Sequence, residues 1–327
     1  MSDVFLSLSG PIHQTFLGVA IALLSANVVL FFRRRMSGKR GDPKVAQRIR
    51  TWWITLAIFV VMLSVSQTTA VAFFAFVSFI AFKEFLSLIP TRRADHRVLF
   101  WAYLAIPLQY LCVGTHWFGM FVIFIPVYMF MWLPTRMVLI GETKGFLRAI
   151  GTVQWGLMTT VFSLSHAAML LAITPVTTAR VAANWPTDLS KESCGAALLV
   201  FLVVLTQFND AAQFCWGKSI GKTPLLPKVS PSKTVGGLVG GIISTVILSG
   251  LVGPWLTLMD LPRSLLAGLI IGLAGFAGDI SIAAFKRDLG VDENAGSLPG
   301  HATTLDRVDS LTYTAPLFFH FIYYCYG

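Results

Sequence analysis

Ten apolar runs, each near the length that crosses a bilayer, constrain the fold of this chain more than any other feature. A helix needs about 20 mostly apolar residues to span the hydrocarbon core. The second, fourth, seventh and tenth runs are short, so tilted, re-entrant or differently bounded helices stay open for them. We expect an all-α, polytopic integral membrane protein of about ten transmembrane helices. The runs cover residues 11–32, 52–67, 69–89, 98–113, 117–133, 151–174, 194–209, 235–257, 264–285 and 311–326.

Composition excludes the main alternative classes of protein. Only 12% of the 327 residues are charged, 55% are hydrophobic, and the mean hydropathy is +0.73. A soluble domain carries about 25% charged residues. A soluble enzyme, a disordered chain and a nucleic-acid binder are therefore excluded. The four cysteines are isolated in the sequence and indicate neither a disulfide framework nor a zinc site.

The basic residues predict an orientation. If the N-terminus lies outside, 22 of the 25 Lys and Arg residues fall in segments on the inner side, as the positive-inside rule requires. The first run lacks the basic start of a signal peptide and is long, so we expect a retained helix. We expect the bacterial inner (plasma) membrane, with the functional side facing the cytoplasm.

Chemistry-bearing residues concentrate in two inner segments, which predicts N-terminal membrane helices over 1–193 and a catalytic membrane region over 194–327. Segment 209–241 combines lysines, hydroxyls and closely spaced glycines before a helix. Glycine lets backbone N–H groups approach an anion, a helix N-terminus favours negative charge, and lysine adds a positive charge. The segment suits a polyphosphate, although a basic loop before a tightly packed helix is the more ordinary interpretation.

The second segment, 278–310, is rich in acids. Asp279 and Lys286 lie seven residues apart and share a helix face, as do Asp306 and Asp309. A carboxylate inside an apolar run is costly and indicates function. These carboxylates suit Mg²⁺, which takes one or two carboxylates together with water and phosphate oxygens. The alternative is a structural ion-pair network, Asp279 with Lys286 and Asp306 with Arg307.

Both segments resemble the phosphatidate cytidylyltransferase (CDP-diacylglycerol synthase) family. The family pattern P-K-x-S-P-x-K-T-x-x-G-x-x-G-G is matched at 227–241. The family signature is matched by Ser281, by Phe285-Lys286-Arg287, by Leu298-Pro299-Gly300-His301 and by Leu305 to Ser310. The resemblance implies transfer of the cytidylyl group of CTP to phosphatidate, giving CDP-diacylglycerol and pyrophosphate, with Mg²⁺ and possible use of a second cation. It also implies a homodimer.

The resemblance assigns roles to individual residues. It implies metal ligation by Asp279 and Asp309 with Asp306 beside them, and phosphate binding by Lys286 and Arg287. The substrate-binding residues that it implies are Asp210, Ser230, Lys233, Thr234, Gly236, Gly237, His301 and Arg307.

One departure keeps other functions open. The family's His-Gly-Gly stands here as His301-Ala302-Thr303, and the added Cβ atoms restrict the backbone. A transferase for a different lipid acceptor, and an inactive paralogue that acts as a transporter or scaffold, are the alternatives. For Lys83 and Glu84, at the end of the third run, we expect an interfacial charge pair, with a direction into a polar cavity as the alternative.

Overall fold

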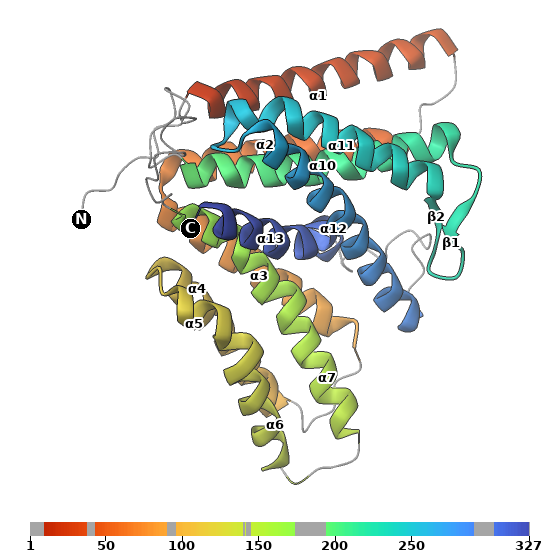
Figure 1. Ribbon diagram of the computed structural model, residues 1–327. Coiled ribbons are helices and arrows are strands. Elements are labelled where there is room, and N and C mark those ends of the chain that lie inside the picture. The colour runs from red at the N-terminus through yellow and green to blue at the C-terminus, as the bar shows by residue number, and fades with distance from the viewer. Residues whose placement is uncertain are drawn as a thin grey trace.

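The computed structural model is an all-α, polytopic bundle, as the apolar runs predict (Figure 1). It describes residues 10–37, 43–89, 96–139, 141, 145–173, 194–290 and 304–326. Each of the ten predicted runs coincides with a helix or a continuous helical rod. The helices and strands are α1 (Gly10–Ser37), α2 (Pro43–Val65), α3 (Gln67–Ser87), α4 (His96–Gly114), α5 (Phe118–Ile123), η2 (Phe124–Met129), α6 (Phe130–Val138), α7 (Phe146–Gly156), η3 (Leu157–Phe162), α8 (Ser163–Met169), η4 (Leu170–Ala172), α10 (Cys194–Ile220), β1 (Pro224–Leu226), β2 (Ser230–Thr234), α11 (Val235–Leu256), α12 (Leu261–Asp288) and α13 (Leu305–Tyr326).

Seven helical rods in the described ranges are long and apolar enough to cross a membrane, and two shorter apolar stretches lie in α2 and α4. The tenth predicted run belongs to α13, which is not among the seven. The reason lies in its sequence, because α13 begins with Asp306, Arg307 and Asp309 and has polar side chains along its length. Protein packed around α13 compensates for this lower hydropathy, since half of its residues are buried.

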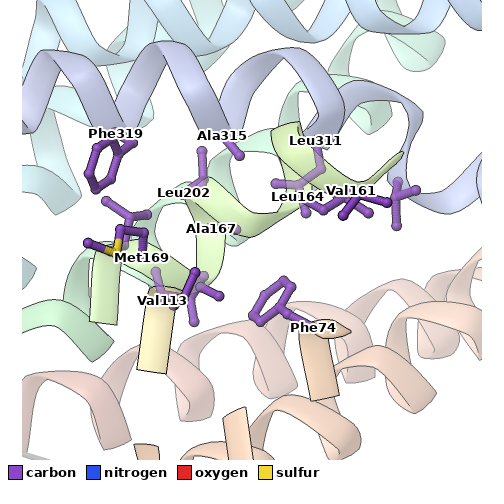
Figure 2. Close-up of a cluster of buried hydrophobic side chains, with 14 of the residues drawn as sticks. Phe74, Val113, Val161, Leu164, Ala167, Met169, Leu202, Leu311, Ala315 and Phe319 are labelled. Atoms are coloured by element: carbon purple, nitrogen blue, oxygen red, sulfur yellow. The ribbon is translucent and has the colours of Figure 1, made fainter. Parts of the chain in front are cut away.

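The helix α8 lies in the interior of the bundle and packs against α13 on one side and against α3 and α4 on the other (Figure 2). Leu164 and Ala167 of α8 are fully buried, as is Ala315 of α13. Phe74 of α3 and Leu202 of α10 belong to the same cluster. A single apolar core therefore joins the N-terminal helices to the C-terminal ones.

The segment between α10 and α11 departs from the basic loop that the sequence predicts. The helix α10 continues past the expected end at 209 to Ile220, so Asp210 lies inside the helix and not at its end. An antiparallel hairpin follows, with Pro224 opposite Thr234 and Leu226 opposite Ser230. Thr234 then caps α11, because its Oγ1 accepts the N–H of Gly237 at 3.1 Å.

Small residues let the last four helices approach closely, as is common between membrane helices. A Cβ added at Gly237 would lie 2.8 Å from the carbonyl oxygen of Gln213, so Gly237 brings α11 against α10. A Cβ at Gly278 would lie 2.5 Å from the backbone oxygen of Asp309. The contact at Gly278 therefore sets α12 directly against the start of α13.

The Gly278 contact predicts opposite effects for two substitutions of glycine by alanine. Alanine normally stabilises a helix by about 1 kcal/mol over glycine, but Gly278→Ala forces the backbones of α12 and α13 apart. We expect Gly278→Ala to lower the thermal midpoint in detergent, and Gly151→Ala, whose Cβ meets nothing within 4 Å, to leave it unchanged or raise it. An equal response of both variants would contradict the close contact.

Candidate active site

A cavity of about 680 Å³ opens where α10, β2, α12 and α13 meet. The two inner segments singled out in the sequence, 209–241 and 278–310, both contribute to it. The predicted site residues that line the cavity are Asp210, Ser230, Lys233, Thr234, Gly237, Asp279, Lys286, Asp306, Arg307 and Asp309. Most of the residues implied by the resemblance therefore share one polar space, although their roles stay predictions.

Two lysine–aspartate pairs cross the cavity. Lys233 of β2 pairs with Asp279 of α12, and Lys286 of α12 pairs with Asp306 of α13. The partners predicted for the alternative ion-pair network, Asp279 with Lys286 and Asp306 with Arg307, are wrong, because among the described residues Asp279 pairs with Lys233 and Asp306 with Lys286. The pairs fasten the hairpin, α12 and α13 to one another around the cavity.

The electrostatics of Lys233 follow from these surroundings. Burial lowers the pKa of Lys233, but the nearby carboxylates, Asp279 first among them and then Asp210 and Asp309, outweigh burial and raise the pKa above its ordinary value. The ammonium group is therefore charged at neutral pH. A charged lysine in a half-buried pocket is suited to bind an anion that enters the pocket.

Asp309 lies among other carboxylates of the cavity. It is half-buried beside the carboxylates of Asp279 and Asp210. It accepts the backbone N–H of Ser310 at 2.7 Å, and the Ser310 hydroxyl donates to Asp210 at 2.9 Å. Neighbouring negative charges repel one another, so the local charge favours a cation between them.

The described carboxylates of the cavity could supply part of the ligand set of Mg²⁺. Within the described ranges, no group of three or more Asp, Glu, His or Cys side chains is arranged to hold a metal ion. Mg²⁺ commonly takes only one or two carboxylates, with water and phosphate oxygens completing its shell. Asp279 and Asp309 could supply two such carboxylates; Asp279 and Asp306 are each also paired with a lysine.

Three predicted site residues lie where a structural role accounts for them. Arg287 is not among the residues that line the cavity; its Nε donates to the carbonyl oxygen of Val229 at 2.9 Å and holds the hairpin. Gly236 is also outside the lining, and a Cβ added there would lie 3.3 Å from the Cα of Gly221 and from the carbonyl oxygen of Ile220. Gly237 lines the cavity, but its N–H is taken by the Thr234 cap. His301, with Ala302 and Thr303, lies outside the described residues.

The cavity also contains residues that the sequence reasoning missed. Gln213 lines it, is buried, and its Nε2 has no hydrogen-bond partner within the described part of the chain. Ser232, Trp52 and Gln207 line it as well. The spacing of Asp210, Gln213 and Gly217 was a usable signal, since residues three and four apart share one helix face, but it required that α10 extend past 209.

Glu84 of α3 caps the N-terminus of α13, the helix that carries the second part of the acidic segment. Its Oε2 accepts the backbone N–H of Thr304 at 2.9 Å and of Leu305 at 2.8 Å. A carboxylate at a helix N-terminus satisfies free N–H groups and complements the helix dipole. Glu84 therefore contacts a residue 220 positions away in the sequence in place of the expected charge pair with Lys83. A pattern of neighbouring residues does not predict such a contact.

Comparison with known proteins gives one family and two kinds of relatives. The model of the family described as "Cytidylyltransferase family" matches residues 46–325. The uncharacterized protein YnbB of Escherichia coli K12 is 42% identical over 306 residues, which cover 94% of this chain and 96% of that relative. The phosphatidate cytidylyltransferase of Haemophilus influenzae is 34% identical over 136 residues, 40% of this chain and 47% of that relative. The enzyme of that name from Aquifex aeolicus is 35% identical over 39% of this chain and 48% of its own length.

The Glu84 cap predicts a specific loss of stability. Glu84→Ala removes both acceptor contacts and the charge at the start of α13, and the loss of a helix cap costs about 1 kcal/mol. We expect the thermal midpoint in detergent to fall by a few degrees. The neighbouring exposed Lys83 provides the matched control, and Lys83→Ala is expected to leave the midpoint unchanged. If both variants melt like the wild type, the cap does not support α13.

Proposed function

The chain belongs to the cytidylyltransferase family, and from that premise we propose that it transfers the cytidylyl group of CTP to phosphatidate, releasing pyrophosphate. Membership of the family makes it a nucleotidyltransferase of the membrane. The name of the relatives from Haemophilus influenzae and Aquifex aeolicus supports phosphatidate as the acceptor. The observation that carries the proposal is the cavity that combines Lys233 and Lys286 with the facing carboxylates Asp279 and Asp309.

The chemistry needs positioning and charge more than a base. In the proposed step, an oxygen of the phosphatidate phosphate attacks the α-phosphorus of CTP. The new P–O bond forms as the bond to the bridging oxygen breaks, and pyrophosphate leaves with the electron pair. The nucleophile is already anionic, so the main barrier is repulsion between phosphates and charge on the leaving group.

Residues of this cavity are suited to lower that barrier. Lys233, Lys286 and Arg307 line the same space and bring positive charge to the phosphates of both substrates. Lys233 and Lys286 are each paired with a carboxylate before substrate arrives. A lysine is a mobile point charge, so each is able to exchange its carboxylate for a phosphate oxygen.

A divalent cation completes the proposed site. We infer that Asp279 and Asp309 hold Mg²⁺, with Asp306 nearby, once lysine contacts shift to the nucleotide. When bound, Mg²⁺ neutralises phosphate charge and orients the reacting groups. Ser310 links two of these acids, because its backbone N–H donates to Asp309 and its hydroxyl donates to Asp210.

The location of the site follows from the charge distribution. We propose that the cavity opens to the cytoplasm at the bacterial inner membrane, because the segments that form it carry basic residues of the expected inner side. CTP is soluble and the acceptor is a membrane lipid, so a site at the ends of membrane helices serves both. A homodimer remains a proposal from the family resemblance alone.

A different lipid phosphate is the second candidate acceptor. YnbB matches nearly the whole chain, whereas the phosphatidate enzymes match about two fifths of it. The His301-Ala302-Thr303 departure falls within the signature itself. An inactive paralogue is disfavoured by the retained Asp279, Lys286 and Asp309, all of which line the cavity.

The metal assignment predicts a selective loss of activity. Pyrophosphate release from CTP, phosphatidate and Mg²⁺ in detergent micelles should fall on the order of 100-fold in Asp309→Asn, because one cation ligand is lost. Asp288→Asn is the matched control, since Asp288 is exposed and outside the cavity, and it should retain wild-type activity. Undiminished release in Asp309→Asn would refute the assignment.

The identity of the acceptor has its own test. Radiolabelled CTP is incubated with the purified protein and, separately, phosphatidate, lysophosphatidate, a polyprenyl phosphate or no lipid. We expect label in CDP-diacylglycerol with phosphatidate, at a rate above that of the other acceptors. Label found only with another lipid phosphate would replace phosphatidate, and no label with any acceptor from a well-folded protein would favour the inactive paralogue.

A further inference from the structure

A second cavity, of about 490 Å³, runs between α1, α2, α10 and α11. Figure 1 shows these four helices side by side at one edge of the bundle. Among the residues whose side chains the structure describes, its lining is almost entirely apolar and includes no charged side chain; Val19, Leu56, Val203 and Val252 represent the four helices. We call it the apolar groove. Its chemistry excludes a nucleotide and fits a hydrocarbon chain.

The apolar groove adjoins the polar cavity. Trp52 of α2 and Gln207 of α10 line both spaces, so the groove begins where the polar lining ends. Trp has an apolar body and a polar tip and suits the boundary between hydrocarbon and water. A molecule with a phosphate in the polar cavity and an apolar tail would pass this boundary.

The length of the apolar groove along α1 suits an acyl chain. Along α1 the lining extends from Gln14 to Ala26, which at 1.5 Å per residue is about 18 Å. Half of the hydrocarbon core of a bilayer is about 15 Å. The groove is therefore long enough for one extended acyl chain.

We propose that the apolar groove binds an acyl chain of the lipid acceptor while its phosphate lies in the polar cavity, an inference that rests on the function proposed above. The helix α1 forms one wall of the groove, yet it precedes the residues matched by the family, which begin at 46. Acyl recognition in this chain thus depends on a helix outside the part that carries the family resemblance.

The first test fills the groove without disturbing the packed core. Gly18 lines the groove, and a Cβ placed there meets nothing within 4 Å, so Gly18→Leu occupies open space. We expect the KM for long-chain phosphatidate to rise about tenfold, which is 1.4 kcal/mol. The KM for CTP and the kinetics with a short-chain phosphatidate should not change. Gly151→Leu, at a glycine with equal space on α7, is the matched control. An unchanged KM for the long-chain lipid, or equal effects of both variants, would overturn the proposal.

The second test does not require turnover. The wild-type protein in vesicles is irradiated with phosphatidate that carries a diazirine near the end of one acyl chain. We expect label on α1 between residues 14 and 26, reduced by excess unlabelled phosphatidate but not by phosphatidylcholine. Equal competition by phosphatidylcholine would mean an ordinary bilayer lipid and would overturn the proposal, as would label confined to other helices.

The two tests separate failure of the groove from failure of the proposed function. If phosphatidate is not a substrate but a different lipid phosphate is, the crosslink to α1 should be displaced by that lipid, and the function alone changes. If phosphatidate is turned over but neither test involves α1, the groove proposal fails and the function stands.

Discussion

The candidate site depends on ion pairs that compensate its partly buried charges. Carboxylates that lie at the ends of apolar helices are costly to desolvate, so they need partners. Asp279 obtains Lys233 from the hairpin, and Asp306 obtains Lys286 from α12. Each pair joins two different elements of the fold. The same pairs that stabilise the apo protein hold two lysines where phosphates are proposed to bind.

Close helix packing places the remaining carboxylates. Gly278 allows the backbone of α12 to touch α13 at Asp309, and this contact brings Asp279 and Asp309 together. Gly275 similarly leaves space for Asn209, whose side chain also accepts a hydrogen bond from Thr245 at 3.1 Å. Because the approach is set by backbone contacts, the spacing of the acids depends less on flexible side chains than on the absence of Cβ atoms.

Sequence periodicity and hydropathy predicted the helices well, because each span must satisfy its own backbone in lipid. The family motifs predicted the residues that share the cavity. The partners of the charges were not predictable from spacing, since Lys233 reaches Asp279 only through the fold of the hairpin. Glu84 was interpreted as a local charge pair, yet its partners lie at the start of α13. Gln213 was not predicted, because the apolar run ends at 209 whereas α10 continues to Ile220.

Two cavities that meet at Trp52 and Gln207 give the molecule a division that the proposed reaction requires. A soluble nucleotide needs charged groups accessible from water, while a lipid acceptor needs an apolar path that keeps its chains out of water. In a single mixed pocket, the acyl chains would lie against charged groups, or the phosphates would lie against apolar side chains. Placing the two linings on the same helix, α10, with Gln207 between Val203 and Asp210, lets one rigid element fix the distance between acyl chain and reacting phosphate. In the proposed complex, α10 thereby determines which part of the lipid lies beside the carboxylates and the lysines.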